Sequence, residues 1–114
     1  MKKNLVVAAI MASGLLFCLQ APASADTKAN YEKNCKKCHG MDGVGDTSEG
    51  KKLKLQDLTS AEYWKKATDK KIHDAIADGV TDPENPKRKM KGYKDKMSEA
   101  EIKDMVEFVK KFKK

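Results

Sequence analysis

The stretch Cys35-Lys36-Lys37-Cys38-His39 decides how this chain of 114 residues is organised. On a helix, thiols three residues apart point to the same side, where both can form thioethers with the two vinyl groups at one edge of a porphyrin. His39 follows directly, so its imidazole can turn beneath the ring and bind the iron. The stretch therefore predicts one covalently attached haem c, with thioethers at Cys35 and Cys38 and with His39 as an axial iron ligand.

Three other kinds of site use similar residues, and the sequence weighs against each of them. A thioredoxin-like redox pair expects a βαβ pattern, which this chain lacks. Zinc needs four ligands, which the motif and the distant His73 would supply, but the adjacent Cys38 and His39 fit one tetrahedron poorly. A structural disulfide would leave His39 without a role. A secreted zinc-binding or disulfide-stapled module is thus kept as the less favoured interpretation.

Residues 1–25 have the features of a secretory signal peptide. Two lysines form the basic start, residues 5–19 the apolar stretch, and Ala23-Ser24-Ala25 the small-residue cleavage site. The apolar stretch is too short and too interrupted for a transmembrane anchor. We therefore expect cleavage after Ala25, loss of Cys18 with the signal, and export of residues 26–114 to the periplasm.

The expected mature chain, residues 26–114, has the length of one small domain whose apolar core alone is marginal. A buried porphyrin would supply the missing apolar surface. Removal of the signal leaves 22 basic and 17 acidic side chains, a net charge of +5. Export and the lack of a recognised binding motif argue against nucleic acid as a partner. An acidic protein surface or an anionic membrane face suits this modest excess of lysine better.

Helical periodicity dominates the mature chain, and no stretch alternates convincingly as a strand, so the expected fold class is all-α. Four helices are expected, over residues 27–38, 59–67, 69–78 and 99–111. Capping boxes of Thr59 with Glu62 and of Ser98 with Glu101 mark the start of the second and the fourth helix. The third has Thr68 or Asp69 as its cap and ends at Gly79. The glycines of segment 41–46 predict positive φ angles. Two prolines predict an irregular, extended segment over residues 80–89.

The pattern from Tyr31 to Phe112 resembles the small monohaem class I c-type cytochromes. In that family an aromatic residue four positions before the first cysteine crosses against an aromatic of the last helix, as Tyr31 and Phe108 would here. The resemblance implies about four short helices wrapped around one haem, with the N- and C-terminal helices crossing. It also implies a methionine as sixth ligand in a loop that commonly reads M-P-x-F. This chain has Met90-Lys91-Gly92-Tyr93 there, with lysine in place of the stiffening proline.

Met90 is the favoured sixth ligand. Its rival Met97 stands at the N′ position beside the Ser98 cap, where an apolar residue usually staples the start of a helix. Three further side chains suit the role less well. Met41 is too close to the motif, Met105 lies on an apolar helix face, and His73 lies on an exposed one. We expect Trp64 to pack with one edge in water rather than to hold a haem propionate.

Ligation by His39 and Met90 leaves no open position on the iron, so we expect a one-electron carrier and not an enzyme. We expect a monomer without stable membrane insertion, whose redox partners dock at an exposed haem edge. A basic collar around that edge would steer acidic partners, and it comprises Lys36, Lys37, Lys87, Arg88, Lys89, Lys91, Lys94 and Lys96. Scattered, solvated lysines are the alternative. If Met90 does not bind, the alternative function is a five-coordinate gas sensor or peroxidase.

Overall fold

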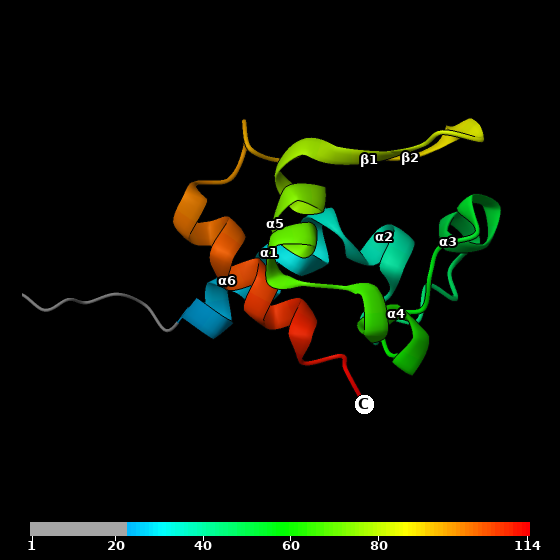
Figure 1. Cartoon of the computed structure of the whole chain (residues 1–114). Helices are drawn as coiled ribbons and strands as arrows, with labels where there is room; N and C mark the ends of the chain where they lie inside the picture. Colours follow the sequence, from blue (N-terminus) through cyan, green and yellow to red (C-terminus); the bar gives the residue numbers. More distant parts are fainter. Residues whose placement is uncertain (1–22) are drawn as a thin grey trace, which may run out of the picture.

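Residues 23–114 are described by the computed structural model, and six helices and two strands follow one another along them (Figure 1). In chain order the elements are α1 (Ala23–Asn34), α2 (Lys36–His39), α3 (Ser48–Leu53), α4 (Ala61–Lys66), α5 (Asp69–Asp78), β1 (Gly79–Asp82), β2 (Asn85–Lys91) and α6 (Glu99–Lys110). Of the predicted signal peptide, residues 1–22, which include Cys18, lie outside the described residues. Ala23 to Ala25 form the first residues of α1.

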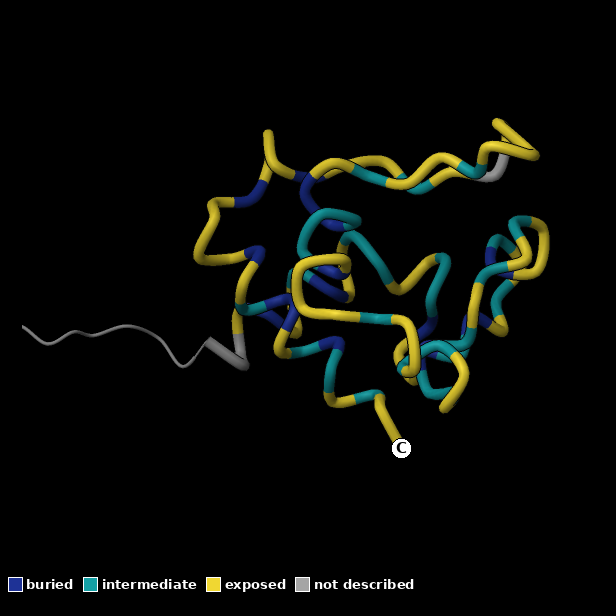
Figure 2. The backbone as a smooth tube through the Cα atoms, in the orientation of Figure 1, coloured by how far each residue is buried: buried dark blue, intermediate teal, exposed yellow. Residues whose placement is uncertain are grey.

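The side chain of Tyr31 joins the first helix to the last. Its ring centroid lies 5.0 Å from that of Phe108 and 5.5 Å from that of Phe112, so the expected aromatic contact between α1 and α6 is confirmed. Helix α6 also packs against α5. The apolar core, dark blue in Figure 2, consists of Tyr31, Leu58, Ile72, Ile76, Ala77, Tyr93, Met97, Ile102, Met105, Val106 and Val109. Most of these residues lie on α1, α5 and α6, in agreement with the predicted all-α class.

Most element boundaries follow local signals in the sequence. Helix α5 begins behind Thr68, whose side chain accepts a hydrogen bond from a first-turn N–H, and it ends at Gly79. The predicted capping box of Ser98 and Glu101 is present at the start of α6. The glycines of segment 41–46 have positive φ angles, as expected. These boundaries were predictable because each depends on neighbouring residues alone.

Four helical features differ from the prediction. Helix α1 begins at Ala23 and not at residue 27. Ser60, not Thr59, caps α4, because the Thr59 hydroxyl instead donates to Asp57 at 2.6 Å. The helix expected over residues 27–38 is interrupted at Cys35, which separates α1 from α2. The short helix α3 was not expected at all. It begins behind Thr47, whose hydroxyl accepts a hydrogen bond from a first-turn N–H.

The segment over residues 80–89, expected to be irregular, belongs to a β-hairpin. Strands β1 and β2 pair antiparallel, with Val80 opposite Met90. This two-stranded sheet is the one β element of residues 23–114. Figure 1 shows it extending from the end of α5 and away from the crossing of α1 and α6. The candidate ligand Met90 thus lies on a paired strand and not in an open loop.

The two prolines of this segment are compatible with strand pairing because of where they fall. Pro83 lies in the turn, and Pro86 lies near the start of an edge strand, where a missing N–H does least harm. The side chain of Asp82 accepts a hydrogen bond from the N–H of Glu84 at 2.8 Å, which stabilises the turn. The segment is therefore extended, as predicted, but paired rather than irregular, since neither proline occupies a central ladder position.

Candidate functional site

A cavity of about 680 Å³ brings the two predicted axial ligands together. His39, the last residue of α2, and Met90, near the end of β2, both line it. The apolar part of its wall comes from the segment before α4, from α4 and α5 and from the hairpin, and includes Leu55, Leu58, Tyr63, Ala67, Ala75 and Val80. Its volume falls within the range of about 300–1,000 Å³ that is typical of small-molecule and cofactor sites.

The two motif cysteines lie on the turn that ends in His39. The N–H groups of Cys38 and His39 donate to the carbonyl oxygen of Cys35 at 3.2 Å and 2.9 Å, so the three residues share one tight turn. Both thiols are free and half-buried. Burial, and secondarily the nearby Cys38, raise the pKa of Cys35 to about 11, which keeps its thiol protonated at neutral pH. His39 lines the cavity, whereas neither cysteine is among the residues that line it.

The imidazole of His39 is in a state suited to binding a metal. Burial lowers its pKa, because desolvation penalises the charged form, so the ring is neutral at neutral pH and can donate a lone pair. Its Nδ1 atom is buried and has no hydrogen-bond partner within the described part of the chain. Such an orphaned polar atom is costly unless a group outside the polypeptide satisfies it. The histidine therefore fits a site completed by a cofactor.

Three side-chain hydroxyls hold the main chain of the motif. Tyr31 donates to the carbonyl of Gly40 at 2.6 Å, directly after His39. Tyr93 donates to the carbonyl of Asn34 at 3.0 Å, directly before Cys35, and Thr47 donates to the carbonyl of Cys38 at 2.8 Å. Burial raises the pKa of Tyr31 far above its ordinary value, which keeps this hydroxyl a donor. The attachment segment, residues 35–39, is thus fixed at both ends and in the middle.

Of the methionines considered from the sequence, Met90 alone shares the cavity with His39. Met97 is only 6% exposed and belongs to the core, and its N–H donates to the carbonyl of Tyr93 at 2.8 Å. Met105 is buried in the core from α6, and Met41 is on the surface. These positions agree with the staple expected for Met97 and with the core role expected for Met105.

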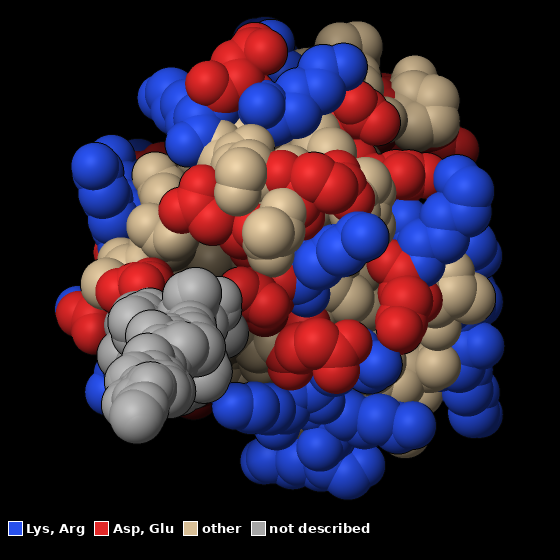
Figure 3. Space-filling view, turned by 90° about the vertical axis from the view of Figure 1, so that its left-hand side faces the viewer, with Lys and Arg blue, Asp and Glu red and all other residues tan. Residues whose placement is uncertain are grey.

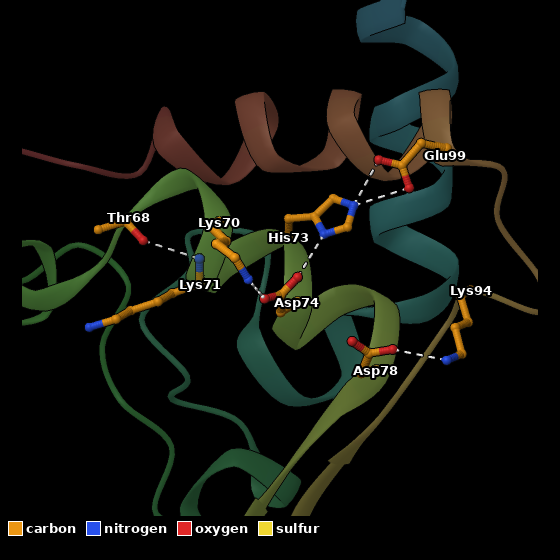
Figure 4. A network of polar contacts seen from close by, with 8 residues as sticks. All are labelled: Thr68, Lys70, Lys71, His73, Asp74, Asp78, Lys94 and Glu99. Atoms are coloured by element: carbon orange, nitrogen blue, oxygen red, sulfur yellow. Dashed lines mark hydrogen bonds and ion pairs between the residues drawn. The ribbon is translucent and has the colours of Figure 1, made fainter.

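His73 belongs to a surface network and not to the cavity (Figure 4). Its Nδ1 lies 3.0 Å from a carboxylate oxygen of Asp74, and its Nε2 lies 2.8 Å from one of Glu99 on the facing helix α6. Hydrogen bonds to Asp74 and then to Glu99 raise the pKa of His73. The zinc interpretation needed this residue beside the motif. Within residues 23–114, no group of three or more His, Cys, Asp or Glu side chains is placed to hold a metal ion.

The indole of Trp64 already has a hydrogen-bond partner inside the protein. Its Nε1–H donates to the carbonyl oxygen of Leu58 at 2.7 Å, and the ring meets that of Tyr63 edge to face at 5.1 Å. The half-buried ring therefore packs, as expected, and its donor is engaged by the main chain. This bond also holds the carbonyl of Leu58, a residue of the cavity wall.

The charged surface is not uniformly basic. Figure 3 shows one face with acidic side chains gathered near its centre and basic ones mainly around them. The lysines of the basic collar are exposed. Lys94 nevertheless forms an ion pair with Asp78 at 3.0 Å, so its charge is partly compensated. The Arg88 side chain lies outside the described part of the protein.

Sequence reasoning missed several contributors to this site. Thr47 was overlooked although a threonine before Ser-Glu is a usual helix-start signal. The wall residues Leu55 and Leu58 carried only the weak signal of an apolar residue in a polar segment. The partner of the Tyr93 hydroxyl had no local signal, because Asn34 lies 59 residues away along the chain.

Comparisons with known proteins give matches that cover most of the chain. The sequence profile of the family described as Cytochrome c matches residues 24–113. Among solved structures, the KustC0563 c-type cytochrome is 32% identical, with a TM-score of 0.64 over 77% of this chain and 98% of that one. A tyrosine-to-phenylalanine mutant of it is 33% identical, with a TM-score of 0.63 over 77% of this chain and 99% of that one.

The search of curated protein sequences gave no match. Among the described residues, no helix has the length and the apolar character needed to cross a membrane.

Proposed function

Because this chain belongs to the cytochrome c family, whose members carry covalently attached haem c, we propose that it is an exported one-electron carrier whose iron is bound by His39 and Met90. Haem c, the cofactor of this protein, supplies an iron that can gain and lose one electron. The observation that carries the proposal is that both side chains line one cavity. Cys35 and Cys38, on the turn that ends in His39, would form the two thioethers.

The proposed ligation favours electron transfer over catalysis. If His39 and Met90 both bound the iron, no position on it would be left for a substrate or for oxygen. A thioether ligand and an apolar wall both favour the reduced, less charged iron, and thereby raise the reduction potential relative to a bis-histidine site. The chain's contribution is therefore to hold two ligands, exclude water and set the potential.

We further propose that acidic redox proteins dock at the exposed edge of the site. The support is the exposure of the collar lysines, of which Lys36 and Lys37 belong to the attachment segment. Steering by opposite charge weakens as salt screens it over a Debye length of about 10 Å at 0.1 M. The rate of electron transfer to an acidic partner should fall as ionic strength rises, and a flat or rising rate would count against the collar.

Export and cleavage after Ala25 belong to the same proposal. The support is the basic start, the apolar stretch and the small-residue cleavage motif of residues 1–25. Covalent haem attachment by this motif takes place outside the cytoplasm in the families that use it, so the predicted export signal is consistent with the haem-attachment motif. A monomer in the periplasm is the expected form, and light scattering of the purified protein measures its mass.

The ligation is tested with two methionine variants of the purified holoprotein. Met90→Leu should abolish the methionine-to-iron charge-transfer band of the ferric protein, whereas the matched control Met97→Leu should keep it and cost less than about 1.5 kcal/mol of stability. Loss of the band in Met97→Leu alone would reverse the assignment. A high-spin ferric spectrum in the unsubstituted protein would favour the five-coordinate sensor or peroxidase.

The covalent attachment is tested independently by intact mass. A mass equal to the chain without residues 1–25 plus one haem, with neither motif thiol open to alkylation, is the expected result. A colourless product with two free thiols would refute the haem and leave the zinc or disulfide interpretation.

A further inference from the structure

The interruption of the helix at Cys35 leaves the carbonyl of Asn34 without its helical donor, and the hydroxyl of the distant Tyr93 donates to it instead. In a continuous helix the N–H of Cys38 would donate to the carbonyl of Asn34. It donates instead to the carbonyl of Cys35 at 3.2 Å. The Tyr93 hydroxyl donates to the Asn34 carbonyl at 3.0 Å and so takes the place of the missing helical donor. A tyrosine that follows β2 thus completes the start of the attachment segment.

Tyr93 is itself firmly held. Its side chain is only 7% exposed. Its N–H donates to the carbonyl of Ile76 in α5 at 2.8 Å, and its own carbonyl accepts from the N–H of Met97 at 2.8 Å. The residue therefore joins three parts of the molecule, namely α5, the chain leading to α6 and the junction of α1 with α2.

Tyr93 follows Met90 by three residues, and main-chain contacts with the end of α5 hold the link between them. Lys91 pairs with Gly79 in the hairpin, and Gly92 packs so closely on α5 that a Cβ would lie 2.5 Å from the carbonyl oxygen of Ala77. The hairpin fixes Met90 from one side through its pairing with Val80. After Met90 along the chain, the first side-chain hydrogen bond to the start of the attachment segment is the one from the Tyr93 hydroxyl.

We propose that Tyr93 is a positioning residue that sets the distance between the attachment segment and the strand carrying Met90. Its hydroxyl ties the residue before Cys35 to the chain that follows Met90, and in this way it keeps Met90 at the cavity that His39 also lines. The proposal rests on the ligation proposed above. Its consequence is that loss of this one oxygen weakens the hold of Met90 on the iron without removing any ligand.

The test compares the unsubstituted holoprotein with Tyr93→Phe and with Thr68→Ala. Phenylalanine keeps the buried ring and removes only the hydroxyl. Thr68→Ala removes a helix-capping hydroxyl at the other end of α5, and Thr68 itself does not line the cavity. Loss of such a cap costs about 1 kcal/mol, close to the net value of one hydrogen bond, so the two variants should lose similar thermal stability. Imidazole is titrated into each ferric protein, where it competes with the methionine for the iron, and the reduction potential of each protein is measured.

The expected result is an imidazole affinity about fivefold higher for Tyr93→Phe, the factor that corresponds to one ordinary net hydrogen bond, together with a lower reduction potential. Thr68→Ala should stay within twofold of the unsubstituted protein. An unchanged affinity in Tyr93→Phe, or an equal rise in both variants, would overturn the role of Tyr93 while leaving the ligation intact. Absence of the methionine charge-transfer band from the unsubstituted protein would instead refute the ligation, and this proposal with it.

Discussion

Replacing Gly50 by alanine tests whether α3 must approach the attachment segment as closely as the structure has it. A Cβ at this position would lie 2.2 Å from the carbonyl oxygen of Gly45 and 2.5 Å from that of Cys38. Ordinary contacts of such an atom begin at 3.4 Å. Both neighbours are main-chain atoms and cannot rotate away, so α3 or the turn that holds Cys38 must move by about 1 Å.

Two effects of opposite sign decide the size of the change. Alanine is favoured over glycine inside a helix by about 0.5–1 kcal/mol. Overpacking a close contact costs about 1–3 kcal/mol, and contacts with main chain belong at the upper end of this range. The clash therefore outweighs the helix propensity, and we expect a net loss of about 1–2 kcal/mol in the free energy of unfolding.

The assay is thermal unfolding of the holoprotein followed by circular dichroism. For a domain of this size the loss corresponds to a fall in Tm of about 5–15 °C. Ser48→Ala is the matched control, because it places alanine on an exposed position of the same helix, and it should change stability by less than about 0.5 kcal/mol. A Gly50→Ala protein as stable as the unsubstituted one, or more stable, would refute the close packing of α3 on the attachment segment.

Three further changes have outcomes that the structure specifies. His73 should stabilise the protein fully below its ordinary pKa of 6.5, and this contribution should vanish as pH rises through its raised folded pKa. The contribution is measured as the difference in unfolding free energy from His73→Gln in urea titrations, and a difference that grows with pH would contradict the Asp74 and Glu99 contacts. Trp64→Phe should cost about 1–2 kcal/mol through the lost hydrogen bond to Leu58, and urea unfolding with no measurable change would show that this bond contributes nothing. Ser98→Ala should cost about 1 kcal/mol through the lost cap of α6; Ser98→Asp, which keeps a capping oxygen, should restore most of that stability, and a failure to do so would assign the loss to something other than the cap.

The sequence by itself determined what depends on near neighbours. The spacing of Cys35, Cys38 and His39 predicted the cofactor, because three residues on one turn meet whatever the rest of the chain does. Thr68 and Ser98 marked two helix starts, since a cap acts on N–H groups within its own first turn. Tyr31 and Phe108 were paired only through the resemblance to a family, and the structure confirms their contact.

Tertiary structure alone decided what joins distant segments. That Met90 and His39 line one cavity follows from the pairing of β1 with β2, which residues 80–89 did not signal, because two prolines masked the strand pattern. The bond from Tyr93 to Asn34 likewise spans 59 residues and forms only once α5, the hairpin and α1 are packed. Neighbouring residues determine dihedral angles and helix caps, whereas the hydrogen-bond partner of a buried polar group depends on which distant segment packs beside it.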